Sequence, residues 1–536
     1  TVTGVQTCAL PISATGLEIR CVATEYHDFP AVEWVLHLKN CASTNTPIIA
    51  DIQALDTVLG PGPFTIHYAR GALASPEDFS PLTRVLNPKA TLRLQPGGGR
   101  SSSEYMPYFN LEMGQTGVVV AIGWTGEWAF RAARDDKDRV QLQAGLAHSH
   151  FTLYPGEAVR SPRILLVFWE GERLRGHNLL RSLILAHYRP SAGAPGMLCT
   201  HTWGTMRVDQ HLDNITQLVK HELPFEYYWI DAEWFGKKLP WWEQNGNWSP
   251  NPALYPAGLK PIGDACHKAG WRFLLWFEPE RVCPGTPIFA EHPEWLLHID
   301  EKSACWSWPK WFDFADPTWY SAESHRNRIS GGEGLLNLGD PAARRFLTDL
   351  ISARITEYGL DVYRQDFNIA PLEFWRANDK PDRQGITEIR YVEGLYAFLD
   401  ELQQRHPGLI IDNCASGGRR LDLEMIRRSV TLTESDSARN TMAQQCQGYG
   451  IRLWLPFVWM HDGDVGDDDY TLRSRMGVHL SLNMTDNKVA TAWQTPATSR
   501  PISDHLPFAA VKQKLEQYLK IRHLFLGDYY PLTEFS

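Results

Sequence analysis

The chain reads LDVYRQDFN at residues 360–368, where an apolar run gives way to charged and amide side chains. Asp366 therefore stands at the carboxyl end of a predicted buried strand, between Arg364 and Asn368. Parallel α/β barrels place their reactive side chains at this end of their strands. A lone aspartate there would more often cap the next helix, so the other strand ends must decide between the two interpretations.

Apolar runs alternate with helical patterns on both sides of Asp366. Helical stretches such as 211–222, 341–358 and 388–405 lie between most of the runs, and only the segment 278–340 is long and irregular. Eight runs with helical crossovers predict a (β/α)8 TIM barrel over residues 197–524. The runs are Met197–Trp203, Phe225–Asp231, Trp271–Phe277, Leu360–Asp366, Leu409–Asn413, Val430–Ser435, Arg452–Phe457 and Gly477–Met484.

Residues 14–172 have a different pattern, with short alternating segments separated by Gly, Pro and Asn. This pattern predicts an N-terminal antiparallel β-sandwich, with strands at Val32–Leu38, Thr91–Leu94, Val118–Trp124, Val140–Leu142 and Ile164–Phe168. Residues 173–196 read as a linker helix followed by a Pro, Ala and Gly boundary. The fold class predicted is therefore multidomain, β plus α/β.

The first residues stand apart from this pattern. Residues 1–13 show neither strand alternation nor a helical period, so we interpret them as a non-native segment and leave them out of the fold prediction. No charged and apolar leader is visible, but the native start is expected to be missing. The compartment, cytoplasmic or exported, is left open.

Composition narrows the class of partner. A net charge of −10 and a pI near 6.0 argue against nucleic acid, and no window approaches the apolar length of a membrane helix. Nine scattered Cys without a CxxC pair, and His residues without HxH or HExxH spacing, predict no metal and no cofactor. The 21 Trp residues favour a small-molecule carbohydrate partner, because indole rings stack on sugar faces.

Nearly every predicted barrel strand ends in a polar cluster that contains a carboxylate. Two carboxylates from different strands suit cleavage of a glycosidic bond, since one attacks the anomeric carbon while the other protonates the leaving oxygen. Asp366 and Asp436 are the candidate pair, and two βα units fit between them. The clusters are His201 and Trp203; Asp231 and Glu233; Trp276, Glu278 and Glu280; Arg364, Asp366 and Asn368; Asp412, Asn413 and Cys414; Glu434 and Asp436.

Four ordered motifs resemble glycoside hydrolase family 36, the α-galactosidase family in a clan with families 27 and 31. WFEPERV at residues 276–282 is similar to the family's WFEPEMV, and YRQDFN at 363–368 to its IKWDMN. CASGGR at 414–419 is similar to CSSGGGR, and ESDS at 434–437 to TSDN. Together they cover the middle of the predicted barrel.

The resemblance implies a role for several residues. Asp366 falls on the nucleophile and Asp436 on the general acid/base of a retaining double displacement. Trp276 falls on a sugar-stacking aromatic, while Cys414 and Gly417 fall on positions near the 2-substituent of the sugar. The family also has a small β domain after the barrel, so residues 525–536 are predicted to begin a truncated C-terminal β domain, and a homo-oligomer is expected.

The chain departs from the family at positions that bind the sugar hydroxyls in the family. The family's LDDGW is Ile230-Asp231-Ala232-Glu233-Trp234 here, and strand alternation would place Asp231 and Glu233 on one side. Arg364 stands in place of a Lys, and Arg328 is the candidate for a missing sugar-contacting Arg. We count Asp231, Glu233, Arg364 and Asn368 among the substrate-binding residues.

The function predicted is a retaining exo-α-glycosidase that removes terminal α-linked galactose from oligosaccharides or glycoconjugates. An α-N-acetylgalactosaminidase, or an enzyme for another galacto-configured sugar, is the first alternative. A transglycosylase is a minor branch. A catalytically inert carbohydrate-binding protein and a metal-dependent hydrolase are the alternatives from other classes.

Overall fold

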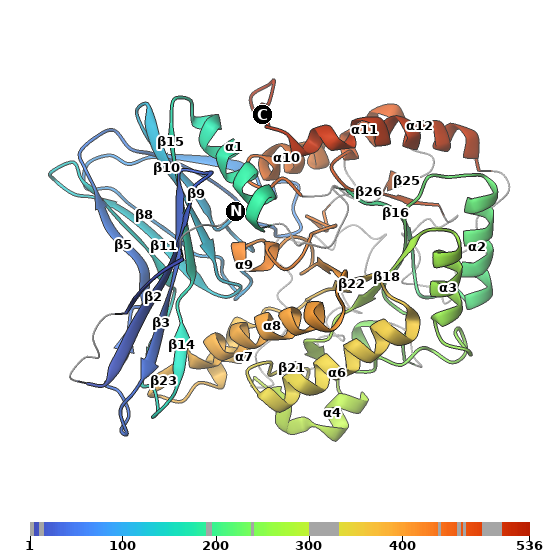
Figure 1. The fold of residues 1–536 in the computed structure, drawn as a ribbon, viewed down its shortest axis with the longest axis horizontal. Coiled ribbons are helices and arrows are strands. Elements are labelled where there is room, and N and C mark those ends of the chain that lie inside the picture. The colour runs from blue at the N-terminus through green and yellow to red at the C-terminus, as the bar shows by residue number, and fades with distance from the viewer. Residues whose placement is uncertain are drawn as a thin grey trace, which may run out of the picture.

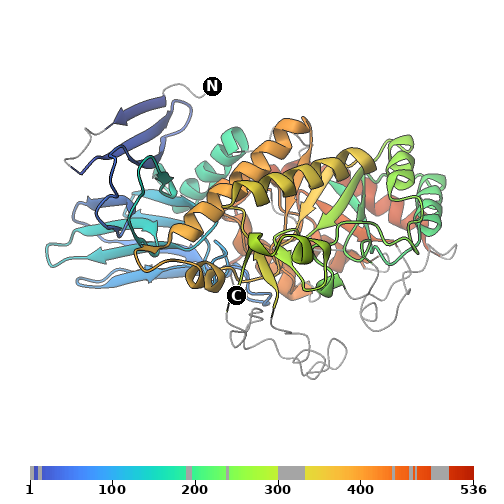
Figure 2. The ribbon, with the colours of Figure 1, turned by 90° about the horizontal axis from the view of Figure 1, so that it is seen from below.

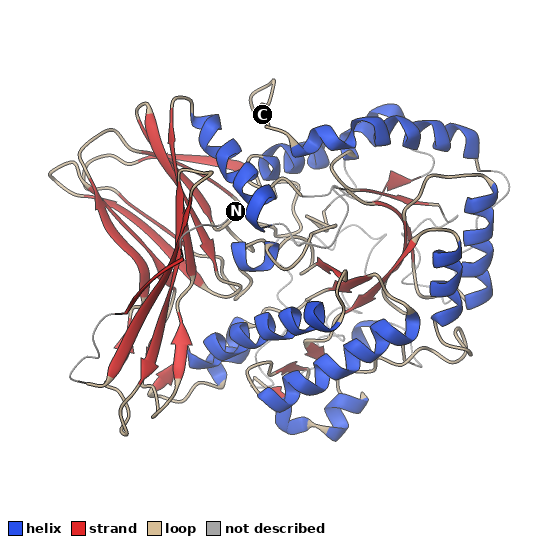
Figure 3. Cartoon of the chain, in the orientation of Figure 1, coloured by secondary structure: helices blue, strands red, loops and turns tan. Residues whose placement is uncertain are grey.

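The computed structural model describes residues 5–9, 15–188, 196–236, 241–299, 332–437, 441–457, 463–464, 468–484 and 506–535. Strands dominate the first part of the chain, and helices alternate with strands in the remainder (Figure 3). Figures 1 and 2 both show the strand-rich part lying to one side of the helical part. The predicted order of a β part followed by a mixed part is confirmed.

Two antiparallel sheets pack face to face in the N-terminal part. Phe109 and Phe130, one from each sheet, stack with ring centroids 3.9 Å apart. The larger sheet contains, in spatial order, β1 (Val5–Ala9), β2 (Leu17–Tyr26), β3 (Ala31–Asn40), β15 (Arg163–Glu170), β10 (Thr116–Gly123), β9 (Tyr108–Met113), β6 (Thr65–Ala69) and β7 (Pro81–Val85), with β14 (Ala158–Arg160) on β3. The smaller contains β5 (Gln53–Leu59), β12 (Val140–Leu146), β11 (Trp128–Arg134) and β8 (Thr91–Leu94).

Each of the five strands predicted in this part is found. Buried and partly exposed residues alternate along β11 and along the first half of β12, as expected for strands that turn one face to a core. The first residues behave differently from the expectation, because Val5–Ala9 forms β1 and pairs antiparallel with β2. Backbone pairing with an open edge strand needs no side-chain alternation, and this is why the pattern missed it.

The helix predicted after the sheets is found as α1 (Arg173–Leu183), continued by a π-helical turn, η1 (Ile184–Tyr188). It lies against β15 and β10 and shares their apolar cluster through Leu180 and Leu183. Arg181 donates to the carbonyls of Leu455 and Gly527 at 3.0 and 2.9 Å. The helix therefore joins the sheets to the C-terminal segments.

A parallel sheet forms the centre of the remaining chain. Its order is β24 (Ile410–Asn413), β22 (Val362–Gln365), β18 (Arg272–Phe277), β17 (Tyr227–Ile230), β16 (Leu198–Thr202), β26 (Leu480–Asn483) and β25 (Gly463–Asp464). The predicted run at Val430 joins β24 by a single parallel bridge to Asp412. The longer helices around the sheet are α2 (Val208–Lys220), α3 (Lys260–Lys268), α6 (Pro341–Tyr358), α8 (Ile386–Arg405), α10 (Thr441–Arg452), α11 (Asp469–Arg475) and α12 (Phe508–Ile521).

One predicted strand is wrong. Arg452 ends helix α10, the residues up to Phe457 form turns, and the strand beside β26 is β25 instead. The run is apolar because Leu453, Trp454 and Leu455 pack against the N-terminal sheets, where Trp454 stacks on Tyr108 at 6.0 Å. An apolar run of this length does not distinguish a strand from a buried turn.

The long segment between β18 and α6 is irregular, as expected. Among its described residues it contains α4 (Pro287–Glu291), η3 (Pro293–Trp295) and a small sheet of β19 (Arg281–Val282), β21 (Gly334–Leu336) and β20 (Leu296–Leu297). Helix α6 then begins on Asp340, whose carboxylate accepts from the N–H of Ala342 at 2.7 Å, and ends on Gly359 at φ +68°.

Short elements complete the described chain. A second small sheet pairs β4 (Ile49–Ala50) and β13 (His150–Phe151) with β23 (Arg383–Gln384). Because β23 lies in the loop before α8, this sheet joins the N-terminal part to the rest of the chain. The others are η2 (Trp241–Glu243), α7 (Leu372–Ala377), α9 (Leu423–Ile426) and η5 (Arg522–Leu526). Residues 506–535 contain no strand, and the predicted C-terminal β domain stays a prediction.

The two parts of the chain share a buried polar interface. Ser101 donates to Asp422 at 2.6 Å, and Ser102 donates to the carbonyl of Gly418 at 2.8 Å. On α8, Glu388 accepts from the indole of Trp124 at 2.9 Å and from the N–H of Glu127 at 2.8 Å. No helix among the described residues is both long and apolar enough to cross a bilayer.

We expect Glu388→Ala to destabilise the protein by about 3 kcal/mol, because it leaves Trp124 and the Arg376 guanidinium, 2.9 Å from Glu388, without their buried acceptor. Glu401→Ala on the same helix removes only an exposed pair with Arg405 and should cost about 0.5 kcal/mol. Thermal unfolding of both variants checks this. Equal melting temperatures would contradict the interface.

Candidate active site

The carboxyl ends of the parallel strands bring most of the predicted site residues together. Trp276 pairs in register with Arg364, and Arg364 pairs with Asp412 on the next strand. Asp231 follows β17, Asp366 and Asn368 follow β22, and Cys414 follows β24. Because parallel strands end at one edge of their sheet, these side chains share a single site.

Asp366 is buried and accepts four hydrogen bonds. Oδ2 accepts from Asn368 Nδ2 at 2.8 Å and from Trp276 Nε1 at 3.2 Å, while Oδ1 accepts from the N–H groups of Phe367 at 2.7 Å and Ser416 at 3.1 Å. Burial by itself would raise the pKa of this carboxyl, but the Arg364 charge and these donors outweigh it and lower the pKa. Asp366 is therefore held as an ionised, oriented carboxylate.

Asn368 is the link between Asp366 and the neighbouring loops. Its side-chain oxygen accepts from Ser416 Oγ at 2.6 Å, and its own N–H donates to Glu278 Oε1 at 2.8 Å. Glu278 is in turn paired with Arg281, 2.6 Å away. Two loops and an ion pair thus fix the amide that orients the Asp366 carboxylate.

Arg364 lies below the site rather than open to it. It forms an ion pair with Asp412, donates to Thr433 Oγ1 at 3.1 Å, and covers the Trp229 ring at 4.5 Å. Its Nε is 3.6 Å from Asp231 Oδ2. A planar guanidinium can meet several partners at fixed angles, so this Arg ties three strands together under the carboxylates.

Asp231 and Glu233 are both buried, but not for the predicted reason. Strand β17 ends at Ile230 and Glu233 has φ +76°, so the two residues are not in a strand and the predicted strand alternation is wrong for them. Burial raises the pKa of Glu233 to about 8, with a further rise from the Asp231 charge. Burial also raises the pKa of Asp231, against the opposing charges of Arg364 and His201.

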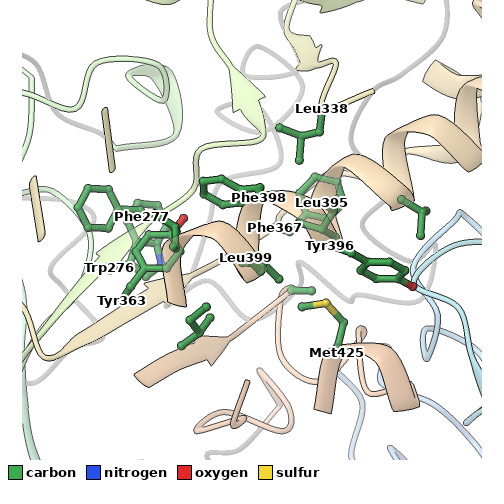
Figure 4. Packing of buried hydrophobic residues seen from close by; sticks show 14 of the residues in the cluster. Trp276, Phe277, Leu338, Tyr363, Phe367, Leu395, Tyr396, Phe398, Leu399 and Met425 are labelled. Carbon is green, nitrogen blue, oxygen red and sulfur yellow. The ribbon is translucent and has the colours of Figure 1, made fainter. Parts of the chain in front are cut away.

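Trp276 lies in an aromatic cluster. Its ring is parallel to Phe235 at 6.0 Å and meets Trp241 edge-on at 5.2 Å. Figure 4 shows Trp276 beside Phe277 and Tyr363, with Phe367 further along towards Leu395 and Leu399. The ring is 1% exposed, and the hydrogen bond to Asp366 is its visible contribution; the sugar-stacking role stays a prediction.

Cys414 and Gly417 lie on the turn after β24. Burial and the Asp366 charge raise the pKa of the Cys414 thiol, which keeps it neutral. Gly417 has φ +81°, and a Cβ there would come within 2.9 Å of Ser435 Cα. This close approach joins the Cys414 turn to the loop of Asp436, because Gly418 N donates to the Glu434 carbonyl at 2.6 Å.

Asp436 differs from Asp366 in its surroundings. The residue is exposed, although the surrounding protein atoms partly desolvate its carboxyl. This desolvation and the charge of Asp366 raise the pKa of Asp436 to about 6, against the opposing charges of Arg419 and Arg364. One ionised carboxylate thus lies within electrostatic reach of another that can hold a proton near neutrality.

Several contributors were not predicted from the sequence. Glu280 was noticed as a strand-end acid, but its pairing with Arg420 at 2.6 Å has no local signal. Arg100, from the N-terminal part, donates to the Phe367 carbonyl at 3.2 Å and to Ser416 Oγ at 3.3 Å. The Glu280–Arg420 pair spans 140 positions and the Arg100 contacts span more than 250, and at such separations periodicity carries no information.

Other predicted features are settled only in part. Arg328 lies outside the described residues. Within the part of the chain that is described, no three His, Cys, Asp or Glu side chains are grouped as metal ligands would be.

Comparison with known proteins shows the family to which the chain belongs. The melibiase family model matches residues 160–312 and 309–485, which together exceed half of the chain. The chain belongs to the melibiase family. The resemblance to glycoside hydrolase family 36 is therefore confirmed.

Two curated relatives show how far the sequence of this chain has diverged within the family. An α-galactosidase of Lactobacillus acidophilus is 24% identical over 377 residues, covering 67% of this chain and 47% of the relative. An α-galactosidase of Pediococcus pentosaceus is 26% identical over 352 residues, covering 62% and 45%. The chain spans about half the length of the curated relatives it matches.

Solved structures share the fold of this melibiase-family chain. The α-galactosidase AgaA of Geobacillus stearothermophilus, solved with stachyose, has a TM-score of 0.76 at 18% identity and covers 96% of this chain and 69% of its own. The α-galactosidase of Lactobacillus brevis has a TM-score of 0.78 at 17% identity, covering 98% and 72%. At this identity the likeness supports the fold alone.

Gly417→Ala is expected to destabilise the site more than a matched glycine substitution. Both Gly417 and Gly408 have positive φ, so Ala at either costs about 1 to 2 kcal/mol of backbone strain. Only at Gly417 would the new Cβ also press on backbone, at 2.9 Å from Ser435 Cα. Thermal unfolding should show a larger loss for Gly417→Ala; equal losses would refute the close approach.

Proposed function

We propose that this protein is a retaining exo-α-glycosidase that releases terminal α-linked galactose. The observation that carries the proposal is the unequal pair of acids: Asp366 with a lowered pKa, and Asp436 with a pKa raised to about 6. The family supports it, since the two relatives described above are named α-galactosidases. Relatives have been solved with stachyose and with raffinose.

The proposed reaction uses the two acids in turn. The Asp366 carboxylate attacks the anomeric carbon and forms a glycosyl ester, while the Asp436 proton goes to the departing glycosidic oxygen. Asp436, now ionised, then takes a proton from water, whose oxygen attacks the same carbon and releases Asp366. Two displacements return the α-configuration. Trp276 and Asn368 keep the Asp366 carboxylate aimed through both steps.

The proposed architecture for this function is an N-terminal β-sandwich over residues 14–172, the 173–196 connection and a (β/α)8 barrel over 197–524. The parallel order of β24, β22, β18, β17, β16, β26 and β25 supports the barrel, with the Val430 bridge next to β24 as its further strand. We retain residues 1–13 as non-native, residues 525–536 as the start of a C-terminal β domain, and a homo-oligomer as parts of this proposal.

Substrate choice is proposed to rest on Asp231 and Glu233. With a pKa of about 8, Glu233 is largely a neutral acid at pH 7 and can donate an O–H, whereas an ionised carboxylate would only accept. By the family resemblance, Cys414 and Gly417 lie near the 2-substituent of the sugar. This substituent is what distinguishes an α-galactoside from an α-N-acetylgalactosaminide. The α-N-acetylgalactosaminide is therefore the competing substrate to assay.

Proton NMR of the reaction with an aryl α-galactoside tests the function. We expect the α-anomer of galactose to appear first, and Asp366→Asn to lower kcat/KM by at least about 1,000-fold, because it removes the nucleophile. Glu373→Gln, a carboxylate change in the first turn of α7, is a control expected to leave turnover unchanged. First release of the β-anomer would exclude a double displacement.

If the folded protein turns over neither the α-galactoside nor its 2-acetamido analogue, it is not an α-galactosidase. Sugar affinity unchanged by Asp366→Ala would then identify an inert carbohydrate-binding protein. Loss of turnover on adding a chelator would point to the metal-dependent class.

The pH profile of kcat/KM should be bell-shaped, with its maximum at acidic pH. Activity requires Asp436 to be protonated, so it should fall as pH rises through about 6. It also requires ionised Asp366, whose lowered pKa places the acidic limb below the usual range for an aspartate. A profile flat to pH 8 would contradict the assignment of Asp436.

A further inference from the structure

The loop between β6 and β7 carries a carboxylate from the N-terminal sheets to the loop of Asp436. Asp78 is 1% exposed. Its Oδ1 accepts from the N–H groups of Leu73 at 2.8 Å and Ser75 at 3.1 Å, and its Oδ2 accepts from Ser435 Oγ at 2.6 Å. Two bonds thus fix the carboxylate in its own loop, and the third spans 357 residues of sequence.

Ser435, the residue before Asp436, uses its whole hydroxyl in these contacts. The O–H donates to Asp78, while Oγ accepts from the N–H of Ser437 at 3.1 Å and from Gln447 Nε2 at 3.4 Å. A hydroxyl has one proton and two lone pairs, so no capacity remains. The residues on both sides of Asp436 are therefore fastened to one oxygen.

Gln447, on α10, strengthens the connection. Its Nε2 also lies 2.9 Å from the carbonyl of Ser75 and 3.2 Å from that of Ser437. The N-terminal loop, the Asp436 loop and helix α10 thus meet at a single amide. A buried network of this kind holds its members in one arrangement, because any displacement leaves a polar group unpaired.

We propose that Asp78 is a positioning residue for Asp436: by accepting the Ser435 hydroxyl, it fixes the backbone that carries the general acid/base. The N-terminal sheets then take part in catalysis without touching the sugar. This inference rests on the proposed function, because it assigns Asp78 to the proton-transfer step of that reaction.

Asp78 and Asp436 also interact through their charges. Asp436 faces the charges of Asp366, Arg419, Arg364 and Asp78, and the Asp78 charge helps to raise its pKa. Asp78 faces Arg419, and its charge also raises the pKa of the buried Glu434. Burial raises the pKa of Asp78 itself to about 6. Neutralising Asp78 should therefore lower the pKa of Asp436.

Asp78→Asn is the informative variant, because it keeps size and the Oδ1 contacts to Leu73 and Ser75. Its amide must donate to Ser435, whose oxygen already accepts from Ser437 and Gln447, so the serine has to move. Ser435→Ala removes the same link from the other side. If the two residues act through one bond, the double variant should lose no more than the larger single loss.

Leaving-group dependence separates positioning from general damage. With methyl α-galactoside, departure needs the proton of Asp436, and Asp78→Asn should lower kcat/KM about tenfold. With 2,4-dinitrophenyl α-galactoside, departure needs no proton, and the loss should be less than about twofold. The basic limb of the pH profile should also move to lower pH. Glu77→Gln, at the exposed neighbouring residue, should change neither substrate's kcat/KM.

Equal losses on both substrates, or none on either, would overturn the role of Asp78 while leaving the proposed function in place. Should Asp78→Asn fail to fold, Ser435→Ala is measured in the same way and is judged by the same two outcomes. A wild-type protein that cleaves neither galactoside nor the corresponding 2-acetamido glycosides would overturn the proposed function, and the role of Asp78 with it.

Discussion

Burying charge at the ends of the parallel strands is the constraint on which the site depends. An ionised carboxylate taken out of water costs several kcal/mol unless opposite charge and donors replace its hydration. Arg364 with Asp412, Arg281 with Glu278 and Arg420 with Glu280 meet this requirement under the site. These pairs also determine geometry, since guanidinium forks bind only at defined angles. The carboxylates are therefore oriented by the layer beneath them.

The same layer divides two aspartates into different roles. Asp366 has four donors and a nearby guanidinium, so its charged form is favoured even though it is buried. Asp436 has no such set of donors among the described contacts and lies in the field of Asp366, so its neutral form survives to a pH of about 6. Surroundings rather than residue type thus separate a nucleophile from an acid, as the proposed reaction requires.

The N-terminal sheets are part of this arrangement rather than an appended module. Arg100 reaches the carbonyl of Phe367 and the hydroxyl of Ser416, the two residues whose N–H groups hold Asp366. Asp78 reaches Ser435 beside Asp436. Each acid of the proposed pair thus has one connection to the sheets. Relative movement of the two parts would leave buried polar groups unpaired, which couples the stability of the interface to the geometry of the site.

The sequence by itself determined most of the elements and the chemistry at their ends, because these are local: alternation in β12, the helical pattern over 341–358, and a carboxylate following nearly every apolar run. It also carried the family motifs. Only the tertiary structure decided what faces those residues. The run Arg452–Phe457 was wrongly predicted as a strand because burial against a distant sheet and burial in a strand leave the same apolar pattern. The left-handed backbone at Glu233 removed it from the alternation of β17. Arg100 and Asp78 escaped notice because their partners lie hundreds of residues away, and hydrogen-bond pairing at that separation leaves no periodic trace.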